Sequence, residues 1–143
     1  MHAVNPSVAN SAATRRVIIL GSTGSIGTQT VEVIEHLNAL HRAGSYHQRI
    51  DVVGLVAGRN ACRHIALCDP QQASDIPSGA RSGVGAAEAM VRELECDLVV
   101  AAMVGAAGLP ATLAAVELGR TVALANKETL VAAGSLIVPA ARV

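Results

Sequence analysis

The sequence predicts an α/β fold in which a parallel sheet is covered by helices on both faces. Short aliphatic runs alternate with helical patterns, beginning with the run VIIL at residues 17–20 and the helical spacing of residues 28–40. Hydrophobic residues make up 51% of the 143 residues, yet the chain has one Tyr and no Phe or Trp. A core of Ala, Val, Leu and Ile suits a buried parallel sheet.

A glycine turn joins the first predicted strand to the first predicted helix. Gly21 ends the strand, and Gly24 and Gly27 follow at intervals of three. Glycine lets the backbone approach a phosphate closely, and the unpaired N–H groups at a helix start attract an anion. The unit therefore predicts a Rossmann-like dinucleotide site, although its G-x-x-G-x-x-G spacing differs from the usual G-x-G-x-x-G. The alternative is an ordinary turn that binds nothing.

The second predicted strand, residues 50–57, ends at Gly58, Arg59 and Asn60. NAD sites commonly carry an acidic residue at this strand end for the ribose 2′-hydroxyl, whereas NADP sites carry an arginine for the 2′-phosphate. The chain has Arg59 and no acidic residue there. The sequence therefore favours NADP over NAD, and the alternative is a solvated loop arginine.

A third strand is predicted at residues 64–68, and a surface loop at residues 71–85. Only residues 61–63 separate this strand from Asn60. A parallel crossover usually needs at least ~10 residues including its helix. Either the third strand is not parallel to its neighbour, or a crossover helix is missing.

The second half of the chain predicts two further strand–helix units. A short helix at 86–95 precedes a strand at 96–104, and small residues at 105–108 open a helix over 109–118 that Gly119 caps. The last strand, residues 121–125, ends at Asn126, Lys127 and Glu128, before a helix over 129–143. Polar residues at this end of a buried strand are typical ligand contacts. Equally, Asn126 can cap the helix with Glu128 in its first turn, and both roles can hold together.

Composition narrows the classes of partner and location. Eleven basic residues balance eleven acidic ones, which gives no support for a nucleic acid or a membrane surface as partner. No apolar run reaches the ~18 residues of a membrane span. Residues 1–14 are small and polar, so we expect a flexible tail and a cytoplasmic location. The histidines and Cys62, Cys68 and Cys96 have no metal-ligand or disulfide spacing, and we expect the thiols to be buried as small apolar groups.

Four motifs carry a family resemblance. They are GSTGSIG at residues 21–27, AGRN at 57–60, AAMVGAAGL at 101–109 and ALANKETLV at 123–131. In this order they resemble the NADPH-binding domain of the 1-deoxy-D-xylulose 5-phosphate reductoisomerases, and the resemblance runs from about Arg16 to the end of the chain, within a domain of residues 15–143. It implies the reaction of that family in non-mevalonate isoprenoid synthesis. The substrate is rearranged and reduced with NADPH to 2-C-methyl-D-erythritol 4-phosphate, with Mg²⁺ or Mn²⁺ polarising the substrate oxygens.

The resemblance also implies a role for individual residues. The cofactor pyrophosphate and ribose would lie against Thr23, Gly24, Ser25 and Ile26. The adenosine 2′-phosphate would lie against Gly58, Arg59 and Asn60. The nicotinamide half would contact Asn126 and Glu128, and Lys127 would reach toward the sugar-phosphate substrate.

Two departures from the family pattern bear on function. Family members have a helix between the AGRN loop and the third strand, where this chain has three residues. The family's acidic metal ligands, its flexible loop and its C-terminal domain lie beyond Val143, so the chain is interpreted as a fragment without catalytic residues or a metal site, inactive alone. A homodimer would form through the absent domains. The alternatives are a non-catalytic dinucleotide-binding module and another NADP-dependent reductase, such as the semialdehyde dehydrogenase type, whose cysteine motif is lacking here.

Overall fold

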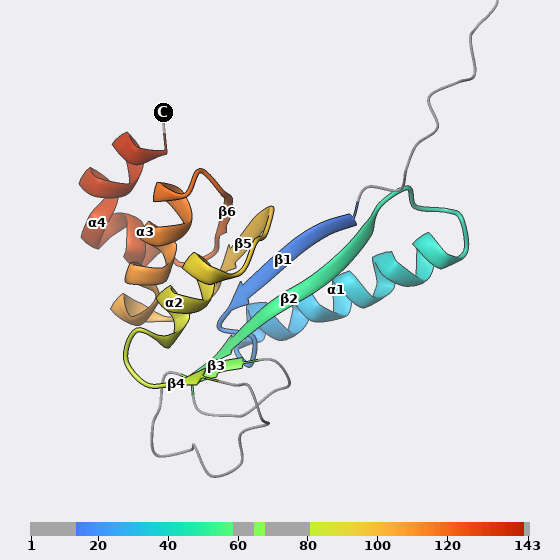
Figure 1. Ribbon diagram of the computed structural model, residues 1–143, viewed down its shortest axis with the longest axis horizontal. Coiled ribbons are helices and arrows are strands. Elements are labelled where there is room, and N and C mark those ends of the chain that lie inside the picture. Colours follow the sequence, from blue (N-terminus) through green and yellow to red (C-terminus); the bar gives the residue numbers. More distant parts are fainter. Residues whose placement is uncertain (1–13, 59–64, 68–80, 142–143) are drawn as a thin grey trace, which may run out of the picture.

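The computed structural model describes residues 14–58, 65–67 and 81–141, which form a parallel sheet between two layers of helices (Figure 1). The strands are β1 (Thr14–Leu20), β2 (Arg49–Ala57), β3 (Ile65–Leu67), β4 (Arg81–Ser82), β5 (Leu98–Ala101) and β6 (Thr121–Leu124). The helices are α1 (Ser25–Arg42), α2 (Ala86–Glu93), α3 (Leu109–Glu117) and α4 (Lys127–Ala140), with a 3-10 turn η2 (Gly105–Gly108) before α3. The predicted doubly wound parallel sheet is confirmed.

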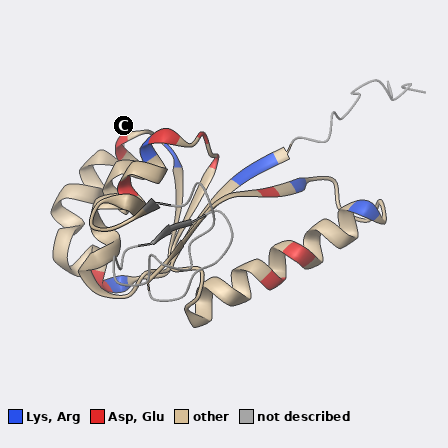
Figure 2. Cartoon of the chain, turned by 60° about the horizontal axis from the view of Figure 1, so that its bottom comes forward, with Lys and Arg blue, Asp and Glu red and all other residues tan. Residues whose placement is uncertain are grey.

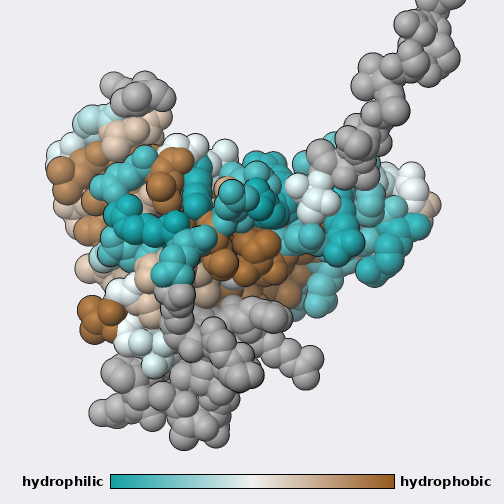
Figure 3. Space-filling model, in the orientation of Figure 1, coloured by the Kyte–Doolittle hydropathy of each residue, from teal (hydrophilic) through white to brown (hydrophobic). Residues whose placement is uncertain are grey.

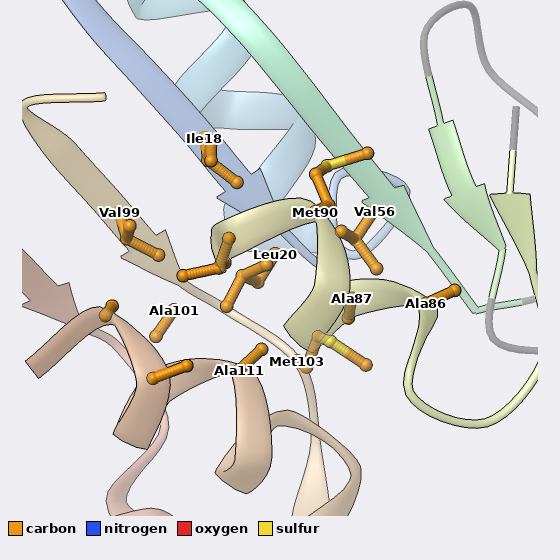
Figure 4. Packing of buried hydrophobic residues seen from close by; sticks show 13 residues of the cluster. Ile18, Leu20, Val56, Ala86, Ala87, Met90, Val99, Ala101, Met103 and Ala111 are labelled. Carbon is orange, nitrogen blue, oxygen red and sulfur yellow. The ribbon is translucent and has the colours of Figure 1, made fainter. Parts of the chain in front are cut away.

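β1 lies inside the sheet and supplies side chains to both of its faces. The strand order is β4-β3-β2-β1-β5-β6. Val17 and Ile19 pack in one cluster with Ile34 of α1. The alternate residues Ile18 and Leu20 pack on the other face, with residues of α2 and α3 (Figure 4). The aliphatic run at residues 17–20 is therefore a strand buried on both sides, as its composition predicts.

The outer edge of the sheet corrects two predictions. β3 pairs with β2 in parallel, with Leu55 opposite Ile65, so the alternative of a strand that is not parallel is wrong. Arg81 and Ser82, inside the predicted surface loop, pair with β3 as the two-residue strand β4. Neither residue is apolar, so the sequence contains no hydrophobic pattern that would predict this strand. Residues 59–64, which include the short connection, lie outside the described residues, as do Cys62 and Cys68.

The second half of the chain follows the predicted order with shifted boundaries. β5 is shorter than predicted, and α4 begins two residues earlier. Gly119 caps α3 as predicted: it has a φ of +68°, and the N–H groups of Gly119 and Arg120 donate to the carbonyls of Val116 and Ala115 at 2.9 and 3.0 Å. These two bonds make a Schellman motif. Thr14, which the sequence assigns to the tail, is the first residue of β1.

Charged residues lie along α1 and toward the two ends of the sheet, away from its apolar centre (Figure 2). Ion pairs at the amino end join Arg16 to Glu95 and Arg49 to Asp51, each at 2.8 Å. Apolar surface is seen at the end of the molecule formed by α3 and α4 and also in the middle of this face (Figure 3). The exposed apolar side chains of α4 include Leu130, Val131 and Leu136. No helix in the described part of the chain is long and apolar enough to cross a membrane.

Candidate dinucleotide-binding site

The site lies where the chain reverses its direction of travel across the sheet. From β1 the chain builds outward through β2, β3 and β4, and it then returns to the other side of β1 to form β5 and β6. Open parallel sheets bind ligands beyond the carboxyl ends of their strands at this kind of switch point. The two strand ends are in close contact, because a Cβ built on Gly21 would lie 2.7 Å from the carbonyl carbon of Ala102.

Two of the three turn glycines are required by the fold itself. Gly21 has a φ of +87°, a conformation that other residues rarely adopt, and no room for a side chain. A Cβ on Gly27 would lie 2.1 Å from the carbonyl oxygen of Gly21, so α1 can approach the end of β1 only with glycine there. Their presence therefore says nothing by itself about a ligand.

Gly24 differs from both. Its φ is −76°, which any residue can adopt, and a Cβ there would meet only the Gly21 carbonyl oxygen, at 3.4 Å. Gly24 is also exposed. Since the fold leaves space for a side chain at this position, the missing Cβ is a gap on the outer side of the turn. A closely approaching pyrophosphate needs such a gap.

The first turn of α1 offers positive charge to that gap. Gly24 is the N-cap and supplies no side-chain hydrogen bond, and the first turn has no acidic residue. The N–H groups there and the positive end of the helix dipole attract anions. Ser25 and Ile26 are exposed beside them, and Thr23 is partly exposed. The structure thus brings together the four residues predicted for the pyrophosphate and ribose.

Ser22, which sequence reasoning missed, ties this turn to the end of β2. Its N–H and that of Gly21 each donate to the carbonyl of Val56 at 2.8 Å, and its buried hydroxyl donates to the same oxygen at 3.3 Å. Gly58 follows two residues later and is exposed. Arg59 and Asn60, predicted for the 2′-phosphate, lie outside the described residues. Gly58, the member of this group that the structure describes, therefore comes two residues after the carbonyl that binds the glycine turn.

The polar cluster after β6 is a helix start. Asn126 is buried, and its Oδ1 accepts from the Glu128 N–H at 2.9 Å, which confirms the predicted cap. Its Nδ2 donates to the carbonyls of Met103 and Gly105. Lys127 and Glu128 are exposed in the first turn, and Lys127 forms no ion pair with any described residue. Nothing in the sequence marks the two carbonyls, because every residue carries one.

Among the described residues, shifted pKa values are found at the end of the sheet away from the candidate site. At the amino end of the sheet, a hydrogen bond from Arg16 lowers the pKa of the Glu95 carboxyl, and burial raises the pKa of the Cys96 thiol. The predicted burial of Cys96 is only partly correct, since the thiol is half-buried and accepts a hydrogen bond from Arg120 Nη1 at 3.0 Å. No group of three or more His, Cys, Asp or Glu among the described residues is arranged to hold a metal ion.

Comparison with known proteins decides the family. A family model described as 1-deoxy-D-xylulose 5-phosphate reductoisomerase matches residues 17–134. The chain belongs to this family. The reductoisomerase of Mycobacterium leprae (strain TN) is 42% identical over 153 residues, which cover 96% of this chain and 35% of the relative. That of Mycolicibacterium smegmatis is 42% identical over 139 residues, covering 89% and 33%. The chain spans about a third of the length of these reductoisomerases.

Solved reductoisomerase structures share the fold. The Zymomonas mobilis enzyme in complex with NADPH has a TM-score of 0.73 and 34% identity, and the match covers 90% of this chain and 36% of that one. A reductoisomerase in complex with NADPH, fosmidomycin and magnesium has a TM-score of 0.69 and 31% identity, covering 90% and 34%. The resemblance drawn from the four motifs is therefore confirmed. The 153 aligned positions exceed the 143 residues of this chain, so the M. leprae relative has residues with no counterpart here.

Proposed function

We propose that this chain binds NADPH across the switch point between β1 and β5 and is the cofactor-binding part of a reductoisomerase. The observation that carries the proposal is the gap at Gly24, a glycine that the fold does not need, at the uncapped start of α1. A dinucleotide pyrophosphate fits both features, because it needs close backbone approach and positive charge. The solved relative with NADPH, at 34% identity, supports the same cofactor.

Each predicted residue then has a place along the cofactor. Thr23, Gly24, Ser25 and Ile26 would hold the pyrophosphate and adjoining ribose. Gly58, Arg59 and Asn60 would hold the 2′-phosphate, where an arginine can form charge-assisted bonds. Asn126 and Glu128 would serve the nicotinamide half, and Lys127 would attract the phosphate or oxygens of a sugar-phosphate substrate. Together they form the binding surface of a domain placed at residues 15–143.

The overall reaction proposed for the parent protein is that of the family. It converts 1-deoxy-D-xylulose 5-phosphate into 2-C-methyl-D-erythritol 4-phosphate, for which bound NADPH supplies the hydride. The chain's own residues would bind and orient that cofactor. The described residues do not fit a divalent metal, so none of them is assigned to one. Two further expectations stay predictions. They are a cytoplasmic location and a homodimer formed through the parts of the relatives that do not align with this chain.

A non-catalytic dinucleotide-binding module is the second candidate, because the gap at Gly24 and the start of α1 indicate cofactor binding and not catalysis. One assay separates the two. NADPH absorbance is followed with 1-deoxy-D-xylulose 5-phosphate and Mg²⁺ or Mn²⁺, first with this chain and then with a chain extended by the family's C-terminal part. We expect NADPH binding without turnover by the short chain, and turnover after extension. Metal-dependent oxidation of NADPH by the short chain would show that its own residues suffice for catalysis.

The binding step has its own test. Fluorescence titration of the chain with NADPH and with NADH should give saturable binding with a preference for NADPH, because only NADPH carries the 2′-phosphate. Failure to bind either cofactor would reject the proposal. Equal affinities for NADPH and NADH would still support a dinucleotide site, but they would contradict the role assigned to Arg59.

A further inference from the structure

Asn126 joins two loops at the carboxyl edge of the sheet. Its Nδ2 donates to the carbonyl oxygens of Met103 and Gly105, the second at 3.0 Å, and its Oδ1 accepts from the Glu128 N–H at 2.9 Å. The first two partners follow β5, and the third lies in the first turn of α4. One side chain therefore fixes the exit of β5 to the start of α4.

The amide of Asn126 is turned into the protein. The residue is 6% exposed, and the bonds occupy both the oxygen and the nitrogen of its side chain. An amide nitrogen has two N–H donors, and two carbonyls accept from this one. A side chain used in this way influences a ligand through the loops that it holds.

Those loops lie next to the end of β1, on the β5 side of the proposed cofactor site. On one side Gly21 packs against them, since a Cβ there would lie 2.7 Å from the carbonyl carbon of Ala102 and 2.8 Å from the nitrogen of Met103. On the other side Asn126 holds Met103 and Gly105. Val104 lies between the two bonded carbonyls and is 88% exposed. The position of Val104 is therefore set by Gly21 on one side and by Asn126 on the other.

We propose that Asn126 is a positioning residue, which sets the β5 side of the cofactor crevice by clamping residues 103–105 to the start of α4. This rests on the proposed NADPH binding and specifies how Asn126 serves it. The clamp lies on the β5 side of β1, whereas Gly58, the described member of the group predicted for the 2′-phosphate, follows β2 on the other side of β1. Asn126 should therefore affect the nicotinamide half of the cofactor and leave the adenosine half unchanged.

Two substitutions test the clamp. In Asn126→Asp the carboxylate still accepts from the Glu128 N–H, but it cannot donate to the two carbonyls and repels them. Burial and the two facing carbonyl oxygens disfavour the charged form, so the pKa of this carboxyl should rise above its ordinary value, and protonation restores one O–H donor. We expect NADPH affinity to fall at least about tenfold at about pH 8 and to recover in part at about pH 5, each relative to the unaltered chain at the same pH. Asn126→Ser, which does not titrate, should show a similar loss at both pH values.

Two further measurements separate positioning from a general loss of structure. 2′,5′-ADP, which carries the adenosine end alone, should bind equally well to all three proteins. Amide hydrogen exchange should rise in both variants at Ala102 and Leu109, whose N–H groups donate to Leu20 and Ala106 on either side of the clamped residues, while exchange in β1 stays unchanged. Equal losses for NADPH and 2′,5′-ADP, or an unchanged NADPH affinity in folded Asn126→Asp, would overturn the proposal. If the unaltered chain binds neither ligand, the proposed function is wrong, and hydrogen exchange alone then decides whether the clamp exists.

Discussion

Gly27 lies against the carbonyl oxygen of Gly21 so closely that a Cβ on Gly27 would stand 2.1 Å from it. At Gly24, three residues earlier, the corresponding distance is 3.4 Å. The same motif thus contains one glycine that the protein interior requires and one that it does not. Substitutions at Gly27 and at Gly24 can therefore distinguish an effect on stability from an effect on binding.

Gly27→Ala should destabilise the chain, because α1 must move away from β1 to relieve the overlap. Overpacking of this kind typically costs about 1–3 kcal/mol. Gly24→Ala should cost less than about 1 kcal/mol, the usual effect of a poorer N-cap residue. Urea unfolding followed by circular dichroism measures both. Equal losses would mean that the two positions are equally constrained.

Gly24→Val should weaken NADPH binding at least about tenfold while the chain stays folded, because a branched side chain would fill the gap that the pyrophosphate needs. Fluorescence titration measures the affinity, and circular dichroism confirms the fold. Ala39→Val, at an exposed position near the other end of α1, is a control that should bind NADPH normally. Unaltered affinity in Gly24→Val would show that the turn has a structural role alone.

Arg59→Asp should reduce or reverse the preference for NADPH over NADH, because aspartate repels the 2′-phosphate and can accept from the ribose 2′-hydroxyl. Titration with both cofactors gives the ratio of affinities. Arg42→Asp, an exposed change of the same charge at the far end of α1, is the matched control and should leave the ratio unchanged. A similar shift in both variants would indicate a general effect of charge.

Thr129→Val should stabilise the chain by about 1 kcal/mol, because the buried Thr129 hydroxyl has no hydrogen-bond partner among the described residues. Thr112→Val should destabilise it by a similar amount, since the equally buried Thr112 hydroxyl donates to the carbonyl of Gly108 at 2.8 Å. Urea unfolding of the pair checks the difference. A loss at Thr129 equal to that at Thr112 would reveal a partner such as a bound water.

The sequence was sufficient to predict the helices and strands that bury apolar residues. The run at residues 17–20, the glycine turn and the helix capped by Gly119 each have a local physical cause that leaves a pattern. β4 left none, because it is a strand of two residues, Arg81 and Ser82, neither of which is apolar.

Within the candidate site, the cap at Asn126 was predictable from residue type. Its bonds to Met103 and Gly105 were not, since they join side chain to backbone across more than twenty positions. The contrast between Gly24 and Gly27 is likewise invisible in the sequence, because it depends on how α1 approaches the end of β1.

The burial of β1 on both faces has a consequence for the alignment of the sheet. In a strand with one apolar face, a slip of one residue would move that face into water, and the hydrophobic effect prevents it. Residues 17–20 are apolar throughout, so most positions of a slipped strand would still bury apolar side chains, although a slip in one direction would bring Arg16 to the buried position of Val17. In both directions the slip is also blocked at the strand's end, where it would place Leu20 or Ser22 at the position of Gly21, with a φ of +87° and no space for a side chain. The turn that faces the ligand is also the stop that holds β1 in register.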